Sequence, residues 1–351
     1  MKALVYRRPG KRQVEDQPRP QIASVTDAIV RVTTTTICGT DLHILKGDVP
    51  EVTDGRILGH EGVGIIEDLG SAVTTFAKGD KVLISCITAC GTCDFCQRGM
   101  RSHCRSGGWL LGHTIDGTQA EYVRIPHAST SLYKLPAGVN EEAAVLLSDI
   151  FPTGFECGVL NGRVKPGDVV AIVGAGPIGL AALITAQFYS PSRIMMIDRD
   201  LNRLDCARRL GATDVFDASR ENLVEEIMAL TAHEGADVVI EAVGTRATFE
   251  MCQALVAPGG TIANVGVHGT PVELKLERLW AHNITMTTGL VDTVTTPLLL
   301  KFLASGRLRA DALITHRFGL SECVSAYETF SDAIHQRALK VILRNDVSAP
   351  A

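Results

Sequence analysis

The chain has 351 residues, of which 46% are hydrophobic and 21% charged, and it carries a formal net charge of −5. This length is too great for one ordinary core and predicts two domains, while the composition excludes extensive disorder. Lys and Arg are spread thinly, which argues against nucleic acid as a partner, because phosphate contacts need a concentrated basic face.

The start of the chain lacks the apolar region of a secretion signal. No run approaches the roughly 20 apolar residues that span a bilayer, so we expect no membrane partner. Ten cysteines in such a chain point to metal binding in a reducing compartment rather than to disulfides. We therefore expect a cytoplasmic protein.

The first 150 residues predict an irregular, mostly β domain. Short β-like runs are separated by glycines and turn pairs. The expected strands cover residues 27–35, 62–69, 80–85 and 120–125.

The pattern changes near Thr153, where apolar runs begin to alternate with helical stretches. Runs of Val, Ile and Met without polar alternation suit strands that are buried on both faces. This alternation predicts a doubly wound parallel sheet with helices on both sides. The tail from about Asp292 returns to mixed patterning and could rejoin the first domain. The expected strands are 169–173, 193–198, 236–240, 261–265 and 284–288, and the expected helices are 178–189 and 202–210.

A glycine-rich loop follows the first of these strands, as Gly174-Ala175-Gly176-Pro177-Ile178-Gly179. In such a G-x-G-x-x-G loop the first glycine allows a tight turn, the second admits a pyrophosphate and the third lets helix and strand pack closely. Asp198 ends the next run and can accept hydrogen bonds from the adenosine ribose. It would also repel a 2′-phosphate, which favours NAD over NADP. The neighbouring Arg199 could instead face a 2′-phosphate, but Asp198 acts on the ribose directly.

Four cysteines lie close together in the first half, as Cys90-x2-Cys93-x2-Cys96-x7-Cys104. Four thiolates around zinc are typical of a structural site, because no position stays open for a substrate. An iron–sulfur cluster also takes four cysteines, but its usual spacings end differently. Four unpaired surface thiols would be an oxidation liability. We therefore expect structural zinc, and we interpret His103 as a bystander rather than an alternative ligand.

Two other motifs carry potential metal ligands, namely Cys38-Gly39-Thr40-Asp41-Leu42-His43 and Gly59-His60-Glu61-Gly62. Each alone says little, since a single buried Cys is usually packing. In a chain that also has a dinucleotide loop and a Cys₄ set, they indicate ligands of a catalytic metal, because hydride transfer from an alcohol needs a cation that activates the oxygen.

With these motifs the chain resembles the zinc-containing medium-chain alcohol dehydrogenases over essentially its full length, and among them the bacterial secondary-alcohol branch. The resemblance implies an α/β protein with NAD, two zinc ions per chain and a small alcohol, aldehyde or ketone as substrate. It implies a GroES-like, mostly β catalytic domain in residues 1–152, a Rossmann cofactor domain in 153–291, and a C-terminal segment, 292–351, that returns to the catalytic domain.

The resemblance also assigns the ligands of the catalytic zinc. Cys38 and His60 fall on the first two positions, and Asp149 falls on the third, where liver-type enzymes carry Cys. An Asp there is similar to the bacterial secondary-alcohol dehydrogenases and to the formaldehyde dismutase branch, whose extra loop and longer chain this sequence does not show. One thiolate, one carboxylate and one neutral imidazole would nearly neutralise Zn²⁺ and leave a fourth position for the alcohol.

Proton transfer and ligand orientation are implied in the same way. Thr40 matches the hydroxyl of the family's proton relay and His43 its imidazole. Asp41 is expected to accept a hydrogen bond from the His60 ring and fix its tautomer. Glu61 matches a residue that can approach the metal without being a resting ligand.

The substrate pocket and further cofactor contacts follow by resemblance. Cys86 stands where liver-type enzymes place a bulky aromatic, and Trp109 matches a pocket-wall tryptophan of the secondary-alcohol group, although core packing is as good an explanation for it. Both favour short secondary alcohols, with primary alcohols also accepted. Lys340 takes the place of an arginine at the pyrophosphate. The other expected contacts are Thr153, Ile178, Val265 and Val267 near the nicotinamide and Arg203 near the adenosine ribose.

The sequence supports other functions less well. A zinc-free quinone or enoyl reductase would lack Cys38, His60 and the Cys₄ set. A polyol or amino-alcohol dehydrogenase is the closer alternative, since Cys38-Gly39-Thr40-Asp41 also occurs in the threonine dehydrogenase branch. A redox or NAD-sensing protein would leave Thr40 and His43 without a purpose. By resemblance, we expect a homodimer or homotetramer that pairs through the open edge strand near 284–288.

Overall fold

A computed structural model describes residues 1–345 of the chain. Its contacts divide the chain into two compact units. Unit 1 contains residues 1–149 together with the chain from Asp292 onward, and unit 2 contains Ile150–Val291. The chain therefore leaves unit 1 once and comes back to it.

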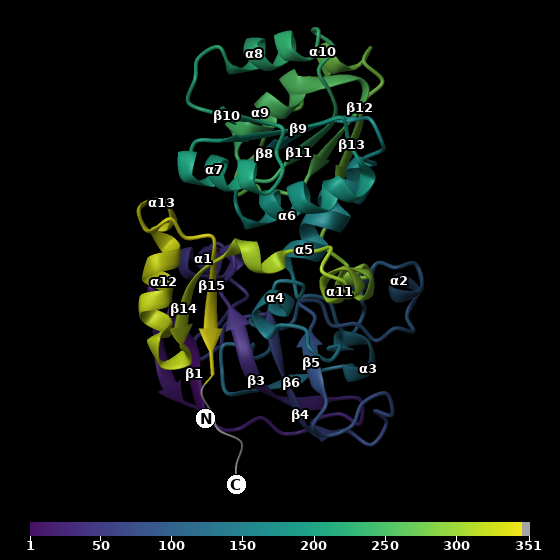
Figure 1. Ribbon diagram of the computed structural model, residues 1–351. Coiled ribbons are helices and arrows are strands. Elements are labelled where there is room, and N and C mark those ends of the chain that lie inside the picture. The colour runs from purple at the N-terminus through teal and green to yellow at the C-terminus, as the bar shows by residue number, and fades with distance from the viewer. Residues whose placement is uncertain (346–351) are drawn as a thin grey trace. The chain divides into compact units, whose positions relative to one another are not determined.

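Unit 2 is built on six parallel strands in the order β10-β9-β8-β11-β12-β13. The chain starts in the middle of the sheet and builds outward in both directions, which confirms the predicted doubly wound sheet. Helices α6 and α7 lie on one side of the strands and α8 and α9 on the other (Figure 1). The strands are β8 (Val169–Val173), β9 (Arg193–Asp198), β10 (Asp214–Asp217), β11 (Ala236–Glu241), β12 (Val256–Asn264) and β13 (Thr285–Thr288). The helical segments are α5 (Ile150–Thr153), the π-helix η2 (Gly154–Leu160), α6 (Pro177–Ala186), η3 (Gln187–Tyr189), α7 (Leu201–Arg209), α8 (Leu223–Leu230), α9 (Arg246–Leu255) and α10 (Leu276–Leu279).

The apolar runs of unit 2 form strands because helices cover both faces of the sheet. Ala171 and Val239 are fully buried in its core, as the continuous hydrophobic pattern requires. One strand differs from its prediction, since β12 begins at Val256 rather than at Thr261. The residues Pro258-Gly259-Gly260 interrupt its apolar pattern, and the pairing with β11 shifts register there.

Unit 1 contains a seven-stranded sheet and a two-stranded β1-β2 hairpin. The last strand, β15, pairs antiparallel with β3 and parallel with β14, so the tail completes the sheet that the first half begins. The strands are β1 (Lys2–Arg8), β2 (Lys11–Asp16), β3 (Ala28–Thr36), β4 (Gly62–Leu69), β5 (Lys81–Ile84), β6 (Tyr122–Ile125), β7 (Leu132–Lys134), β14 (Ile314–Gly319) and β15 (Lys340–Arg344).

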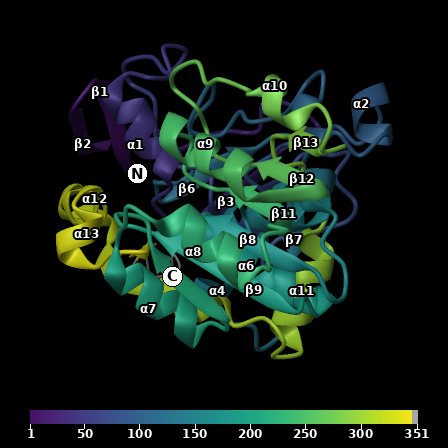
Figure 2. The same cartoon turned by 90° about the horizontal axis from the view of Figure 1, so that it is seen from above.

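The tail also contributes to the core of unit 1. Helix α12 lies beside the β1-β2 hairpin (Figure 2). Its Tyr327 packs in one cluster with Leu4, Ile44 and Val341, which come from both ends of the chain. The helical segments are α1 (Gly39–Lys46), α2 (Asp94–Gln97), η1 (Arg101–His103), α3 (Ala128–Ser131), α4 (Glu141–Val145), α11 (Thr296–Ala304), η4 (Ala310–Leu313), η5 (Leu320–Glu322), α12 (Cys323–Ser331) and α13 (Ala333–Gln336).

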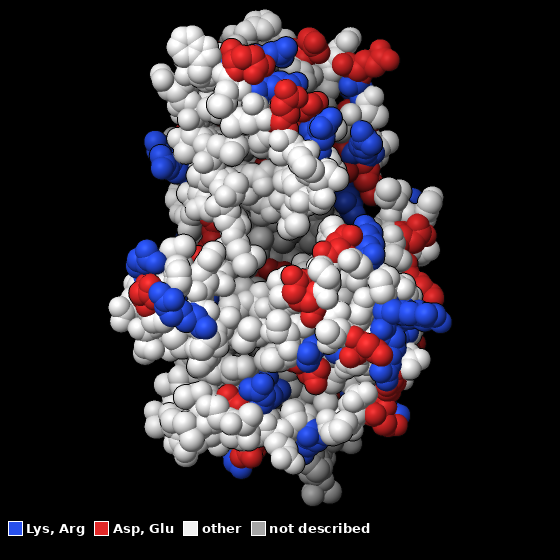
Figure 3. Space-filling model, turned by 180° about the vertical axis from the view of Figure 1, so that it is seen from behind, with Lys and Arg blue, Asp and Glu red and all other residues white. Residues whose placement is uncertain are grey.

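Charged side chains of both signs are interspersed on the face of the molecule in Figure 3. Several exposed charges form pairs, such as Arg105 with Asp94 and Lys78 with Asp68. Among residues 1–345, no helix is long and apolar enough to cross a membrane.

Candidate active site

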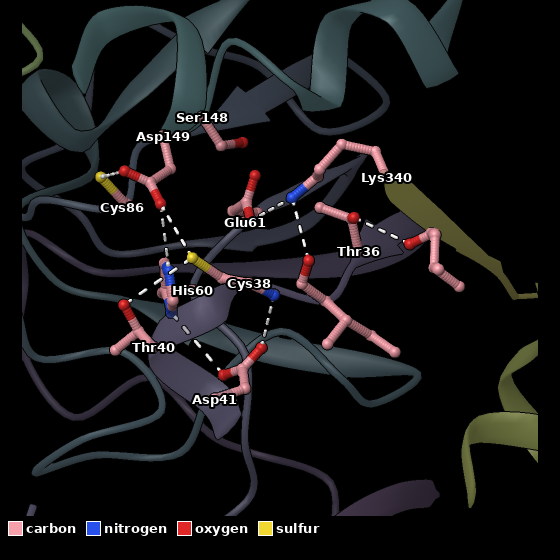
Figure 4. A network of polar contacts seen from close by, with 12 residues as sticks. Thr36, Cys38, Thr40, Asp41, His60, Glu61, Cys86, Ser148, Asp149 and Lys340 are labelled. Carbon is pink, nitrogen blue, oxygen red and sulfur yellow. Dashed lines mark hydrogen bonds and ion pairs between the residues drawn. The ribbon is translucent and has the colours of Figure 1, made fainter. Parts of the chain in front are cut away.

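Four potential metal ligands from three segments of unit 1 converge at one buried point (Figure 4). They are Cys38, His60, Glu61 and Asp149, and their donor atoms all lie within 4.8 Å of one another. Asp149 Oδ2 is 3.3 Å from Cys38 Sγ and 3.4 Å from His60 Nε2. A tetrahedral zinc with bonds of about 2.0–2.3 Å would set its ligands about 3.3–3.8 Å apart. The cluster therefore has the donors and the spacing of a zinc site.

Local structure explains how these ligands are placed. Cys38 follows β3 and caps α1, which ends at Gly47 with a φ of 89°. The carbonyl of Glu61 accepts hydrogen bonds from the hydroxyls of Thr35 and Thr118, at 2.6 and 2.7 Å. Ser148, next to Asp149, accepts a bond from the amide of Gly62 at 3.1 Å. These buried hydroxyls hold the backbone beside the ligands.

These supporting hydroxyls could hardly be predicted from the sequence. Thr118 belongs to none of the motifs, and Thr35 stands in a run of four threonines inside a predicted strand. The spacing within a motif indicates which of its residues bind the metal. A hydroxyl that supports those ligands from another part of the chain can be identified only in the folded structure.

Glu61 differs from the other three ligands because it has an ammonium partner. Lys340 Nζ donates to Glu61 Oε1 at 2.8 Å and to the carbonyl of Ile37 at 3.0 Å. Burial raises the pKa of Glu61 to about 7, although Lys340 acts in the opposite direction. The pyrophosphate contact expected of Lys340 stays a prediction, and its 1% exposed side chain has a buried partner that the sequence did not suggest.

Asp41 lies behind the His60 ring. Asp41 Oδ1 is 3.9 Å from His60 Nδ1, which is longer than a hydrogen bond. Both atoms are buried and have no hydrogen-bond partner among residues 1–345. Asp41 Oδ2 accepts the Cys38 amide at 2.9 Å. The two residues are thus adjacent, as expected, but their atoms are too far apart for the expected hydrogen bond.

The remaining candidates of the first half surround this cluster. Thr40 Oγ1 is 3.7 Å from Cys38 Sγ, and Cys86 Sγ is 3.7 Å from Asp149 Oδ1. The Trp109 ring lies edge-on to the His60 ring, with centroids 6.3 Å apart. His43 lies on α1 with Thr40; its Nδ1 contacts Asp48 at 2.9 Å and its side chain is 42% exposed.

The four cysteines of the Cys₄ loop also converge. Their sulfur atoms lie within 4.8 Å of one another, and Cys90 Sγ is 3.9 Å from Cys96 Sγ. Cys90 Sγ accepts the backbone amide of Cys93 at 3.4 Å, and Cys104 Sγ accepts that of Cys90 at 3.2 Å. Burial alone would raise the pKa of Cys90, but the amides of Thr92 and Cys93 lower it to about 5. These amides favour the thiolate at Cys90, the form that binds zinc, whereas burial raises the pKa of Cys96 to about 12.

His103 lies beside this loop without belonging to the sulfur cluster. Its Nδ1 contacts Ser102 Oγ at 3.0 Å, and its ring lies 6.0 Å from the Phe95 ring.

The glycine loop of unit 2 has the geometry that a dinucleotide needs. Gly174 has a φ of 108°, which favours glycine, and a Cβ at Gly179 would lie 1.8 Å from the Gly174 carbonyl oxygen. At Gly176 a Cβ would meet only the tip of Arg203, at 3.7 Å. The first and third glycines therefore serve the turn and the packing, while the second leaves open space before α6.

A cavity of about 580 Å³ opens beside this loop. Its lining includes Gly174, Gly176, Asp198, Arg199, Arg203 and Thr245. Asp198 Oδ2 accepts the Ala175 amide at 2.6 Å, and its Oδ1 accepts the Asp200 amide at 2.8 Å. These bonds hold the carboxylate at the mouth of the glycine loop, where an adenosine ribose would reach it.

The other expected cofactor contacts also belong to unit 2. Thr153 ends α5, Pro177 and Ile178 begin α6, and Val265 directly follows β12. Val267 is 73% exposed in the loop after β12. None of these residues lines the 580 Å³ cavity.

Comparison with known proteins places this geometry in a family. Residues 24–137 match the alcohol dehydrogenase GroES-like domain, and residues 177–305 match the zinc-binding dehydrogenase model. An alcohol dehydrogenase from Cupriavidus necator is 38% identical, with 95% of each chain covered. A probable NADP-dependent isopropanol dehydrogenase from Mycoplasma pneumoniae is 31% identical, with 91% of this chain and 92% of that protein covered.

A solved structure agrees with these relatives. The zinc-dependent alcohol dehydrogenase 2 from Streptococcus pneumonia, in its apo form, is 53% identical and matches with a TM-score of 0.96, with both chains fully covered. The GroES-like β domain and the doubly wound α/β sheet are therefore the fold of this chain, which belongs to the zinc-type alcohol dehydrogenase family.

Proposed function

We propose that this chain is an NAD-dependent zinc alcohol dehydrogenase that interconverts short primary or secondary alcohols with aldehydes or ketones. In this proposal unit 1 carries the catalytic residues and unit 2 binds the dinucleotide. The observation that carries it is the convergence of Cys38, His60 and Asp149 at zinc-ligand spacing in a chain of this family.

Cys38, His60 and Asp149 would hold the catalytic zinc. Glu61 is the fourth donor in reach. Lys340 binds its Oε1, and its Oε2 has no hydrogen-bond partner among residues 1–345. We propose that the Lys340 ion pair keeps Glu61 beside the zinc rather than on it, which leaves three protein ligands and a position open for substrate. Zinc bound there would supply a Lewis acid that lowers the pKa of an alcohol hydroxyl or polarises a carbonyl. Cys90, Cys93, Cys96 and Cys104 would hold a second, structural zinc.

The chain's own residues would then move the proton. The Thr40 hydroxyl lies beside the ligand cluster, 3.7 Å from Cys38 Sγ, and would accept the proton of the alcohol. His43, at 42% exposure, would pass it to solvent, which suits an imidazole near neutral pH. Asp41 would orient the His60 ring from behind.

Asp198 supports NAD as the cofactor. Its carboxylate is fixed by two backbone amides at the glycine loop, where it would bind the ribose hydroxyls and repel a 2′-phosphate. Arg203 lies 3.7 Å from the open side of Gly176 and would add positive charge there. The Mycoplasma pneumoniae relative is named for NADP, so NADP is the alternative that kinetics must exclude.

The pocket residues favour small substrates with two carbon substituents. Cys86 is a short side chain next to Asp149, and Trp109 supplies an aromatic wall beside His60. The isopropanol named for the Mycoplasma pneumoniae relative fits such a pocket. The second candidate is a polyol or amino-alcohol dehydrogenase of the same family, since the segment from Cys38 to Asp41 is shared with the threonine dehydrogenase branch.

We also propose a homodimer or homotetramer that works in the cytoplasm. Strand β13 ends the sheet of unit 2, and its Met286 is 43% exposed, so a second copy could add its own edge strand there. All ten cysteines are free thiols, which suits a reducing compartment.

One experiment tests the proposed function. Initial rates are measured on 2-propanol, ethanol, sorbitol, threonine and formaldehyde, with NAD⁺ and with NADP⁺, alongside the zinc content of the same preparation. We expect the highest kcat/KM on 2-propanol or ethanol with NAD⁺ and two zinc ions per chain. A higher kcat/KM on sorbitol or threonine would support the second candidate, and turnover without bound zinc would refute the proposal.

A further inference from the structure

The Asp41 carboxylate is 1% exposed, and only one of its two oxygens accepts hydrogen bonds from the described residues. Its Oδ2 accepts two hydrogen bonds, from the Cys38 amide at 2.9 Å and from Gln119 Nε2 at 3.2 Å. Its Oδ1 has no hydrogen-bond partner among the described residues and faces His60 Nδ1 at 3.9 Å. The position of Oδ1, and with it the negative charge that faces His60 Nδ1, therefore depends on what fixes Oδ2.

Gln119 is fully buried, and its surroundings determine how its amide is oriented. The NH₂ group donates to Asp41 Oδ2 and to the carbonyl of Thr36, each at 3.2 Å. An amide turned by 180° would set its oxygen against this carboxylate and this carbonyl, three acceptors facing one another. One orientation alone satisfies the site, and it directs Gln119 Oε1 away from Asp41.

Tyr327 completes the chain of hydrogen bonds. Its hydroxyl donates to Gln119 Oε1 at 2.9 Å, and its side chain is 0% exposed. A buried amide oxygen without this donor would cost free energy. The Tyr327 ring cannot shift easily, because it packs in the core of unit 1 and Arg12 lies over its face at 4.9 Å.

We propose that Gln119 and Tyr327 are positioning residues for the catalytic metal, acting through Asp41 on the tautomer and orientation of His60. This inference rests on the zinc site of the proposed function. An Nδ1–H directed at Asp41 leaves the lone pair of His60 Nε2 directed at Cys38 and Asp149, as a metal ligand requires. The network thus links the tail of the chain, through Tyr327 on α12, to the ligands of the first half.

The effect should appear in metal affinity. We replace Gln119 by Met, which keeps its length and removes its hydrogen bonds, and Tyr327 by Phe, which removes only the hydroxyl. Zinc is titrated out of the full chain with a chelator, and the loss from each site is followed separately with Asp149→Asn and Cys93→Ser as single-site references. Gln119→Met should weaken the Cys38 site by about tenfold or more, in the range for outer partners of metal ligands.

Two further results distinguish positioning from a general loss of structure. Tyr327→Phe should weaken zinc binding at the same site to a smaller extent. The double variant should bind zinc no more weakly than Gln119→Met alone, since Tyr327 acts on Asp41 through Gln119. The Cys₄ site in the same molecule should be unchanged. Phe330→Leu, which lies on α12 in the same core cluster, is the matched control and should leave both affinities unchanged.

Other outcomes overturn the inference in ways that can be told apart. Wild-type affinity at the Cys38 site in both Gln119→Met and Tyr327→Phe would refute the positioning role alone. An equal loss in Phe330→Leu, or at the Cys₄ site, would assign the effect to folding and refute it as well. A wild-type chain that holds only the Cys₄ zinc would refute the proposed function and this inference together.

Discussion

Lys340 and Glu61 form an ion pair of 2.8 Å in which both side chains are 1% exposed. The two residues are 279 positions apart, so the last strand of the chain supplies the counter-charge for a residue adjoining the His60 ligand. A buried ammonium is costly unless it is paired and hydrogen-bonded, and the Ile37 carbonyl provides the second bond. The pair thus ties β15 to the candidate metal site.

Breaking this pair should destabilise the protein strongly. Lys340→Met leaves the Glu61 carboxylate buried without a cation, and we expect it to lower the free energy of unfolding by about 3–5 kcal/mol. The double variant Lys340→Met/Glu61→Gln should recover part of that loss, and Lys340→Arg is the charge-conserving control. Denaturant unfolding gives the values, and losses that simply add in the double variant would show that the pair is not coupled.

The sequence predicted those strands and helices whose hydrophobic pattern directly reflects how they are buried. Val169–Val173 is a continuous apolar run because both faces of β8 are covered, and its bounds match the prediction. Strand β2 was not predicted, because Lys11–Asp16 is mostly polar and none of its residues is buried. In the candidate site, the cysteine spacing identified a set that does converge, whereas Gln119 and Tyr327, 208 positions apart, leave no local pattern.

Removing one ligand should remove one zinc. Asp149→Asn weakens the Cys38 site and should reduce the zinc content from two ions per chain to about one, because a neutral amide replaces a carboxylate ligand. Cys93→Ser should remove the other ion. Zinc is measured by elemental analysis after gel filtration. Cys86→Ala, whose sulfur also contacts Asp149, is the control that should keep both ions, and two ions in Asp149→Asn would exclude Asp149 as a ligand.

His43→Ala should slow proton release. His43 follows Thr40 on α1 and its side chain is 42% exposed, so its loss should lower kcat near pH 7 by about tenfold or more, less than the full effect of a general base. Imidazole in the buffer should restore part of the rate. Asp48→Asn, which removes only the negative charge of the partner of the ring, should have a smaller effect. Unchanged kcat in His43→Ala would remove this residue from the proton path.

Asp198→Ser should shift the cofactor preference toward NADP⁺. The variant loses a carboxylate that would repel the 2′-phosphate by ~1–4 kcal/mol, so the ratio of kcat/KM for NADP⁺ to that for NAD⁺ should rise by about tenfold or more. Asp217→Ser is the matched control, because Asp217 pairs with Asp198 in register on β10 and does not line the cavity. An equal change of ratio in both variants would contradict a direct contact with the ribose.

The stabilising effect of Glu141 on unit 1 should be lost in acid. Burial alone would raise its pKa, but the Lys81 ammonium and the Thr33 hydroxyl bind the carboxylate and hold the pKa below its ordinary value of 4.5. A carboxyl group whose pKa is lower in the folded state contributes stability above its unfolded pKa and loses it as the pH falls through the folded value.

The variant Glu141→Gln tests this dependence. It should lower the free energy of unfolding at pH 7 by about 1–2 kcal/mol, since it removes a charged hydrogen-bond acceptor. The difference from the wild type should stay constant down to about pH 5 and shrink below pH 4.5, where the wild-type carboxyl gains a proton and comes to resemble the amide. Exposed Glu51→Gln is the control, and a difference that persists unchanged to pH 3 would show that the pKa of Glu141 is not lowered by folding.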